Sequence, residues 1–415
     1  MASAALTGEP LEVDVAIVGG GMVGASLAVA LADSGRRVLM VESVPVEAAS
    51  QPSFDERSTA LGNASQRIFA SLGTWDAIAP EAAAITTIHV SDAGRFGFAR
   101  LTAAEQGVEA FGYVVPNRRI GASLWAVLRA APHVTLRAPA TVAEVAVAPG
   151  GVSLRLGEES ATSERVSAQL VVAADGAHSR VRAAAGIDVS VEDYNQVAVV
   201  AKVSADHPHR GVAHERFTPR GPIAALPLAD GTLAVIWACT PAVAGELLSL
   251  DERDYLGRLQ RQFGWRAGRF LRAGRRGSYP LKLSRAAASI ATRTVLIGNA
   301  AQALHPVAGQ GFNLGLRDAA MLAEVIANAD GDVGAPALLQ RFAEWRARDR
   351  RGVIGFTDSL IKVFAASVPG VGVLRDLGLL LFDLAPPAKS ALARLGAGVG
   401  GPVPRLARGV GVRRV

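Results

Sequence analysis

The first strong pattern along the chain is an apolar run, a glycine-rich turn, a small-residue segment and a second apolar run. Val13 to Val18 is apolar except for Asp14, Ala25 to Gly35 is rich in alanine, and Val38 to Val41 is apolar before Glu42. Short buried runs bounded by turn residues are typical of parallel strands, and the longer segment between them favours a helix. The pattern therefore predicts a strand–turn–helix–strand unit at the start of the fold.

Alternating and helical patterns continue through the rest of the chain. Strands are expected over 85–91, 96–101, 113–116, 134–136, 142–147, 152–156 and 169–174, and helices over 58–72 and 118–130. Between Ile187 and about Ile290, strand-like runs separated by turns predict a mixed sheet with one helix over 251–263. A short strand over 294–297 follows, then helices over 315–329, 337–350, 354–366 and 374–384, and the stretch from Gly396 is expected to be poorly ordered.

Three glycines in the first turn have the spacing of a dinucleotide-binding motif. Gly19, Gly21 and Gly24 fit G-x-G-x-x-G, in which the first allows a tight turn, the second lets the backbone approach a pyrophosphate, and the third lets the helix pack on the strand. Glu42 ends the second strand about 20 residues on, where an acid binds ribose hydroxyls. An ordinary glycine-rich turn is the alternative, but the strand, helix and acid together favour a dinucleotide site.

Length and charge limit the other interpretations. A chain of 415 residues predicts two domains, and the single cysteine, Cys239, excludes a disulfide framework and a zinc–thiolate cluster. No leader with a basic start and an apolar core precedes Leu11, and no apolar run reaches about 18 residues, so we expect a cytoplasmic protein without a membrane span. His207, His209 and His214 lack acids or cysteines at ligand spacing, so a solvated loop is favoured over a metal site.

The positive charge is concentrated near the C-terminus. The chain carries a net charge of +6, and the segment from Arg341 onward holds 13 Lys and Arg against 5 Asp and Glu, which leaves the first 340 residues slightly acidic. Such a tail suggests an acidic partner surface, either anionic lipid or protein, and a solvated helix face is the alternative. Nucleic acid is not favoured, because aromatic residues suited to base stacking are not interleaved with the basic ones.

In two later stretches an apolar run is again followed by a glycine-containing turn and a helix. The apolar run 171–174 ends in Asp175-Gly176 before a short Arg-bearing helix. The second stretch runs from Gly298-Asn299 through Pro306 to Gly309-Gln310-Gly311-Phe312-Asn313 at the start of a helix. Together with the first glycine turn, the three motifs identify a resemblance to the FAD-dependent aromatic-ring hydroxylases of the para-hydroxybenzoate hydroxylase type. Stretches such as Glu215 to Thr218 resemble the ubiquinone-biosynthesis branch and, within it, the 2-polyprenyl-6-methoxyphenol hydroxylases.

The resemblance implies a fold class and a domain organisation. The expected fold is α/β, with a Rossmann-like FAD-binding domain over 1–75, 103–186 and 291–340. A mixed-sheet substrate domain over 76–102 and 187–290 would be inserted into it, and 341–415 would form a helical, basic C-terminal region.

The resemblance also assigns cofactor-binding residues. The ADP half of FAD would lie against Gly19, Gly21, Gly24 and Glu42, and the pyrophosphate side against Asp175 and Gly176. Arg57 would lie near the flavin or the nicotinamide path, Asn117 would contact the flavin, and its ring would lie against Pro306, Gly309, Gly311, Phe312 and Asn313. Asn299 stands where most relatives have an aspartate that accepts a hydrogen bond from the ribityl chain. An amide oxygen still accepts, so this substitution weakens one contact without abolishing binding.

The implied activity is a monooxygenase that hydroxylates the phenolic ring of a polyprenyl ubiquinone precursor with O2 and NAD(P)H, through a flavin C4a-hydroperoxide. Alternatives are hydroxylation of another ring position or of a pigment or polyketide phenol, and a non-catalytic flavin-binding subunit of a quinone-synthesis complex. A residue that deprotonates the phenol is not assigned, and no metal is expected. Because a polyprenyl substrate resides in the bilayer, the region 352–415 is expected to contact the inner membrane or partners of a ubiquinone-biosynthesis complex.

Overall fold

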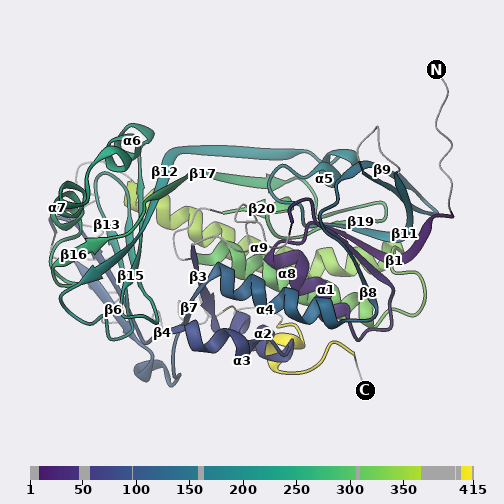
Figure 1. The fold of residues 1–415 in the computed structure, drawn as a ribbon, viewed down its shortest axis with the longest axis horizontal. Coiled ribbons are helices and arrows are strands. Elements are labelled where there is room, and N and C mark those ends of the chain that lie inside the picture. Colours follow the sequence, from purple (N-terminus) through teal and green to yellow (C-terminus); the bar gives the residue numbers. More distant parts are fainter. Residues whose placement is uncertain are drawn as a thin grey trace.

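The computed structural model describes residues 9–45, 57–95, 97–157, 163–304, 309–365, 398 and 403–413, with the backbone alone over 352–365. Within these residues the fold is α/β, as the sequence predicts. Two large sheets lie at opposite ends of the molecule, and a layer of helices covers the first of them (Figure 1).

The first sheet contains the predicted strand–turn–helix–strand unit. Its central strands are parallel, in the order β19–β11–β1–β2–β8, and β9, β10 and β18 are added antiparallel. Their near-continuous apolar sequences suit a sheet that is buried on both faces. The strands are β1 (Leu11–Val18), β2 (Val38–Val41), β8 (Val134–Arg137), β9 (Val142–Ala148), β10 (Gly151–Leu156), β11 (Glu164–Ala173), β18 (Ile290–Ala291) and β19 (Thr294–Leu296).

Three helices pack on one another and on this sheet to form the largest core. Leu27, Leu124 and Leu316, one from each helix, are fully buried there. The helices of this lobe are α1 (Met22–Leu31), α2 (Asn63–Ser71), α3 (Trp75–Ile78), α4 (Asn117–Ala130), α5 (Arg180–Ala184), α8 (Gln310–Ala327) and α9 (Pro336–Ala365), with 3₁₀ turns η2 (Ala79–Glu81), η3 (Ala104–Gln106) and η4 (Gly298–Ala300).

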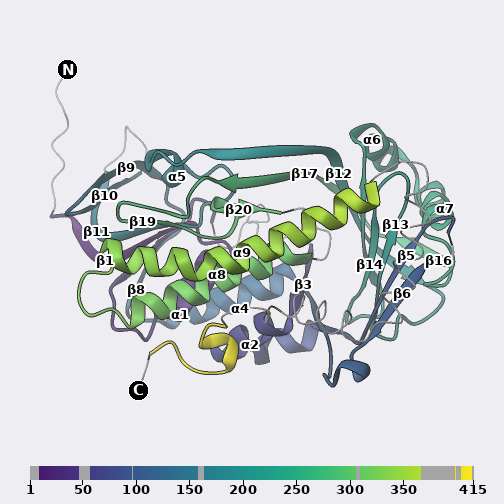
Figure 2. The same ribbon diagram turned by 180° about the vertical axis from the view of Figure 1, so that it is seen from behind.

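The second sheet is mixed and stands at the other end of the molecule. Strands β12 and β17 are long and connect the two ends, and α6 and α7 cover the outer face of the sheet (Figure 2). The order is β20–β17–β12–β15–β14–β13–β5–β6, with β16 beside β12. The elements are β5 (Thr87–Asp92), β6 (Phe98–Thr102), β12 (Val189–Ala205), β13 (Val212–Phe217), β14 (Ile223–Pro227), β15 (Leu233–Cys239), β16 (Phe270–Ala273), β17 (Gly277–Ala286), β20 (Gln302–Ala303), α6 (Pro241–Ser249) and α7 (Glu252–Phe263).

Three element predictions are wrong. The single helix predicted between 187 and 290 is two helices, because α6 precedes α7. The helix predicted over 58–72 begins only at Asn63, because residues 58–62 form strand β3 (Ser58–Gly62), which pairs with β7 (Gly112–Pro116) in a small sheet with β4 (Ala83–Ile85). The separate helices predicted over 337–350 and 354–366 are one continuous helix, α9, because isolated glycines such as Gly352 and Gly355 weaken a helix without ending it. The helix predicted over 374–384 lies outside the described residues.

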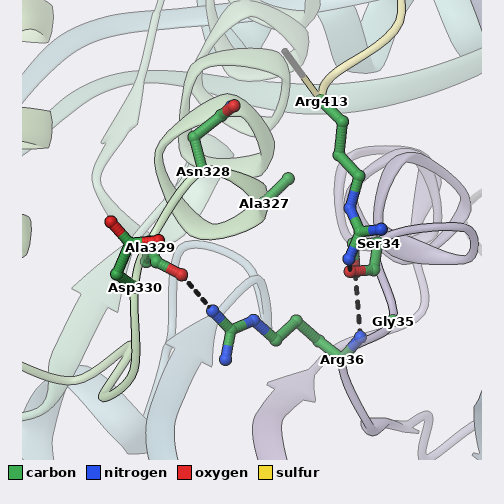
Figure 3. Close-up of a pocket in the computed structure, with 8 residues that line it drawn as sticks. All are labelled: Ser34, Gly35, Arg36, Ala327, Asn328, Ala329, Asp330 and Arg413. Carbon is green, nitrogen blue, oxygen red and sulfur yellow. Dashed lines mark hydrogen bonds between the residues drawn. The ribbon is translucent and has the colours of Figure 1, made fainter. Parts of the chain in front are cut away.

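The C-terminal segment 403–413 is ordered against the first lobe, which corrects the expectation of poor order from Gly396. It contains a 3₁₀ turn, η6 (Leu406–Arg408), in which Leu406 is 3% exposed and its carbonyl accepts a hydrogen bond from Ser71 Oγ at 2.8 Å. Arg413 donates to the Ser34 carbonyl, and Arg36 donates to the Ala329 carbonyl across the same hollow (Figure 3). Several basic residues of the tail therefore serve internal contacts.

Candidate functional site

One cavity of about 1640 Å³ lies between the first lobe and the inner face of the second sheet. It exceeds the roughly 300–1,000 Å³ typical of small-molecule pockets, so it has room for a large ligand and a second molecule beside it. The predicted site residues that line it come from widely separated parts of the chain: Gly19, Gly21, Glu42, Arg57, Asn117, Asp175, Gly176, Asn299, Gly309, Gly311 and Phe312. Pro306 lies outside the described residues.

The glycines of the first turn have different roles. Gly19 has φ of +105°, and a Cβ there would lie 2.4 Å from the Ala174 carbonyl oxygen. A Cβ on Gly24 would lie 2.0 Å from the Gly19 carbonyl oxygen, so this glycine permits α1 to pack on the turn. At Gly21, in contrast, a Cβ would meet no atom within 4 Å. The second glycine therefore faces open space at the start of α1, where backbone N–H groups suit a pyrophosphate.

Glu42 is buried and holds the glycine turn from the end of β2. Its Oε2 accepts a hydrogen bond from the Gly20 N–H at 2.7 Å, and its Oε1 accepts one from the Val44 N–H at 2.8 Å. Each carboxylate oxygen retains acceptor capacity, and the residue lines the cavity, so it can also bind ribose hydroxyls.

Asp175 has one oxygen engaged and one without a partner. Its Oδ2 accepts from the Arg180 N–H at 2.8 Å, which fixes the start of α5. Its Oδ1 is buried and has no hydrogen-bond donor among the described residues. A buried acceptor without a donor is costly unless a ligand satisfies it. This orphaned oxygen in the cavity wall therefore fits a ligand that carries hydroxyl groups.

The start of α8 forms another part of the wall. Gly309 is the N-cap residue with φ of +59°, and Gly311 and Phe312 line the cavity. Asn313 instead has its side chain saturated by protein: Oδ1 accepts from Gly62 N at 2.9 Å and Ser65 Oγ at 2.6 Å, and Nδ2 donates to the Ala60 and Gly309 carbonyls. Asn313 thus positions Gly309 at the start of α8 rather than offering its amide to a ligand.

Arg57 and Asn117 lie where the small sheet meets the second lobe. The Arg57 guanidinium lies over the Tyr279 ring of β17, 5.4 Å from its centre. Asn117 is 4% exposed, its Oδ1 accepts from Thr59 Oγ1 at 2.7 Å, and its N–H donates to the Arg57 carbonyl at 2.8 Å. The N-cap of α4 is Pro116, so Asn117 is not a helix cap, and it links β3 to α4 beside the cavity.

The inner face of the second sheet completes the cavity with mainly apolar side chains, among them Ala213, Ala224, Leu226, Ile236 and Leu281. An apolar wall opposite a polar, glycine-lined wall suits a ligand that is held by its polar end and carries an aromatic or aliphatic group.

Comparison with known proteins agrees with this geometry. A family model described as "FAD binding domain" matches residues 12–357. The chain is 37% identical to the ubiquinone hydroxylase UbiL of Rhodospirillum rubrum over 96% of this chain and 93% of that protein. It is 33% identical to the 3-demethoxyubiquinol 3-hydroxylase of Escherichia coli over 92% of this chain and 96% of that one. The chain belongs to the FAD-dependent monooxygenase family.

The monooxygenase also shares its fold with solved members of the superfamily. The p-nitrophenol 4-monooxygenase PnpA of Pseudomonas putida superposes with a TM-score of 0.77, over 94% of this chain and 99% of that one, at 20% identity. FAD is the cofactor of the family, and NAD(P)H is its typical co-substrate. The open face of Gly21 and the orphaned Asp175 Oδ1 show that the residues of this chain fit FAD.

A buried charge cluster behind the Gly298–Asn299 turn is a part of the monooxygenase that the motifs do not reveal. Asp318 is fully buried; it accepts from the Gly298 N–H at 3.2 Å, from Gln302 Nε2 at 2.9 Å and from Arg346 Nε at 2.6 Å. Although burial acts to raise the pKa of Asp318, the guanidinium groups of Arg350 and Arg346 hold it below its usual range. The cluster also contains Arg317 and Asp349, which pair at 2.8 Å.

This cluster holds the turn that presents Asn299 to the cavity. The spacing of Arg346, Asp349 and Arg350 on one helix is the sequence signal that could have suggested it, because residues three and four apart share a helix face. Their partner Asp318 lies on a different helix, and sequence spacing does not predict that pairing.

Proposed function

We propose that this monooxygenase hydroxylates the phenolic ring of a polyprenylated ubiquinone precursor, 2-polyprenyl-6-methoxyphenol, with O2 and NAD(P)H. The observation that carries the proposal is the single cavity in which the three cofactor motifs meet an apolar wall of the second sheet. The relatives named as ubiquinone hydroxylases support the substrate class. An apolar wall suits a prenylated ring better than a small charged aromatic acid.

The chain's own residues would divide the work along the cavity. Gly21, Glu42 and Asp175 would hold the ADP and pyrophosphate parts of FAD, and Asn299 the ribityl chain. The N–H groups at the start of α8, at Gly311 and Phe312, would stabilise negative charge on the flavin by about 0.3–2 kcal/mol. When bound, FAD supplies the electrons and the activated oxygen, and the protein orients the ring and excludes water.

The decisive experiment is deletion of the gene followed by mass spectrometry of the quinone precursors. Accumulation of 2-polyprenyl-6-methoxyphenol, reversed by the intact gene, is the expected result. The E. coli relative is named as a 3-demethoxyubiquinol 3-hydroxylase. Accumulation of a demethoxy precursor would therefore refute the proposed ring position and indicate hydroxylation at that other position. An unchanged quinone profile would refute the proposed pathway role.

A second measurement separates an enzyme from a flavin-binding subunit. Purified holoenzyme, given NADPH or NADH and a short-chain 2-prenyl-6-methoxyphenol, should oxidise the nicotinamide faster when the phenol is present and should release a product heavier by one oxygen. Bound flavin without phenol-stimulated oxidation and without product would favour the non-catalytic alternative.

Within this proposal, the region 352–415 brings the enzyme to an anionic membrane surface. The support is the excess of basic residues in this region, together with a substrate that partitions into lipid. None of the described helices combines the length and apolar character that a membrane crossing needs. Removing the whole region would be a poor test, because Leu406 and Ala407 belong to the core of the first lobe.

The membrane proposal is better tested in the full-length protein. We expect joint replacement of Lys362, Arg375, Lys389 and Arg394 by glutamine to reduce sedimentation with vesicles of phosphatidylglycerol and phosphatidylethanolamine. The reduction should be strongest at low salt, since surface electrostatics are screened by ions. Replacement of the internally bonded Arg405 should leave vesicle binding unchanged. Equal binding of the quadruple variant and the original protein would refute this role.

A further inference from the structure

One acidic side chain stands in the apolar wall of the cavity. Glu215 lies in the middle of β13, where it pairs with Ala224 of β14 on one side and Val90 of β5 on the other. Successive side chains of a strand point to opposite faces. Ala224 and Leu226 line the cavity, so Glu215, opposite Ala224, points to the cavity as well.

The side chains of its two neighbours in the sequence point the other way, and burial lowers the pKa of His214 to about 4, so this ring is neutral near pH 7. His214 packs edge-on against Phe263 of α7 at 5.8 Å, and Arg216 donates to the Gln262 carbonyl at 3.2 Å, both on the outer face of the sheet. The Glu215 carboxyl has no hydrogen bond or ion pair with the described part of the chain. Burial raises the pKa of this carboxyl to about 7, with no opposing charge to lower it.

Other titratable groups share the cavity but belong to other parts of its wall. Two are acids of the cofactor motifs, and several basic groups lie around β12, β17 and the loop before β17. The set comprises Glu42, Arg57, Asp175, His178, Arg180, Lys202, His214, Arg275, Arg276, Tyr279 and Lys282, and the ring of His214 packs against Phe263 of α7. Lys202 is paired with Asp230, and Lys282 with Asp193 at 3.1 Å, so these two lysines are already neutralised.

We propose that Glu215 is the catalytic base that accepts the phenolic proton of the substrate. This inference rests on the proposed function, because it needs a phenol in the cavity. As the ring is hydroxylated, the phenolic O–H bond breaks, its electron pair stays on the substrate oxygen, and the proton binds a Glu215 Oε atom. The carbon that gains the hydroxyl then loses its proton to solvent water, which balances the proton taken up as the second atom of O2 leaves as water. The electron pair of that C–H bond restores the aromatic ring, and Glu215 returns its own proton to the substrate oxygen and ends ionised.

A carboxylate in this position would favour the reaction in two ways. A phenolate pushes electron density into the ring, which makes the ring carbon a better acceptor of electrophilic oxygen. A base whose pKa lies near the working pH is both available in its ionised form and strong enough to share the proton. The unpartnered carboxyl has a cost to folding, which is typical of a residue kept for function.

The first test is the pH profile of the holoenzyme with a short-chain 2-prenyl-6-methoxyphenol. For the original enzyme, kcat/KM should rise with pH through an apparent pKa near 7, since the active form of the base is ionised. In Glu215→Gln, kcat/KM should no longer rise with pH, and at pH 8 it should be at least 10²-fold lower than in the original enzyme. Glu192→Gln, on an exposed part of β12, is the matched control, and it should keep both the pH dependence and the magnitude of kcat/KM. An unchanged profile in Glu215→Gln would overturn the assignment.

The second test does not depend on turnover. Titration of the flavin absorbance should show that the original protein binds 2-geranyl-6-methoxyphenol at least tenfold more tightly at pH 8 than its methyl ether, which has no proton to donate. Glu215→Leu should bind the two ligands equally. Equal preference in the two proteins would overturn the assignment. A protein that shows the preference but hydroxylates no ubiquinone precursor would support Glu215 and refute the proposed function.

Thermal unfolding distinguishes this role from a structural one. The carboxyl has a raised pKa in the folded state, so the folded protein binds this proton more tightly than the unfolded chain between about pH 4.5 and 7. The original protein should therefore lose stability relative to Glu215→Gln as pH rises through this window. A structural carboxylate would show the reverse, with Glu215→Gln less stable at pH 8, and that result would overturn the proposal.

Discussion

Some residues of the site are needed for packing of the protein itself, and others leave space or a free acceptor atom for a ligand. Both kinds occur within one motif. Gly24 is required by the protein itself, because a side chain there would enter the Gly19 carbonyl. Gly21, three residues earlier, has free space where a side chain would be. The same division separates Asn313, whose amide is saturated by protein, from Asp175, whose Oδ1 is left open.

Gly21→Ala should therefore weaken FAD binding without unfolding the protein. The backbone at Gly21 is extended, with φ of −61°, so alanine fits the chain, but its methyl group would occupy the space that the pyrophosphate approaches. We expect the dissociation constant for FAD, measured by fluorescence titration, to rise at least tenfold, about 1.4 kcal/mol. The apo protein should keep its Tm within about 2 °C.

Gly24→Ala is the matched comparison at the same motif. The added Cβ would lie 2.0 Å from a backbone oxygen. This variant should therefore be destabilised even without FAD, and its apo form should have a clearly lower Tm. If Gly21→Ala and Gly24→Ala lowered the Tm equally, the second glycine would be structural and the division argued here would be wrong.

Sequence could predict the glycines because their roles are local and their spacing is fixed by one turn. The sequence could not predict which hydrogen bonds Asn313 makes, or to which face of the sheet the Glu215 side chain points. Asn313 bonds to residues about 250 positions away, and the direction of Glu215 depends on the register of three strands from two parts of the chain. Such contacts are set by tertiary packing, which local patterns do not encode.

At the scale of elements, the turn that carries Asn299 depends on two helices behind it. Asp318 of α8 accepts a hydrogen bond from the turn and pairs with Arg346 and Arg350 of α9. Because α9 runs as one helix past α8, these charges come together in the interior. The prediction of separate helices over 337–350 and 354–366 was wrong because the sequence pattern shows each half but does not show that the backbone stays helical between them.

Asp318→Asn should be among the most destabilising single substitutions in the first lobe. The amide would remove the carboxylate that pairs with both Arg346 and Arg350, and Asp349 would be left as the partner of Arg346. Breaking a buried pair from one side costs about 3–5 kcal/mol. Urea unfolding of the apo proteins would measure this difference. Asp193→Asn, which removes a half-exposed pair with Lys282, should cost much less, because solvent screens an exposed pair. Similar losses in the two variants would contradict a supporting role for the buried cluster.

At the scale of the whole molecule, the cavity joins two lobes with different tasks. The first sheet and its helices present polar groups and backbone N–H groups, and the described part of the second sheet presents a mainly apolar surface around the Glu215 carboxyl, with Lys202 and Lys282 also in the wall. The long strands β12 and β17 and the contact of Arg57 with Tyr279 connect the lobes. Cofactor binding and substrate binding should therefore be separable by substitutions on the second sheet alone.

Two adjacent residues of β14 offer that separation, because their side chains point to opposite faces. Ala224 lines the cavity, whereas Ala225 is fully buried in the core beneath α7. Ala224→Phe should fill the space beside Glu215, so FAD affinity and Tm should stay close to those of the original protein while phenol-stimulated NAD(P)H oxidation falls at least tenfold. Ala225→Phe should instead overpack the core and lower stability by about 1–3 kcal/mol or more. Loss of FAD from Ala224→Phe would show that the flavin reaches the second sheet, and the division of the cavity into a cofactor wall and a substrate wall would then be wrong.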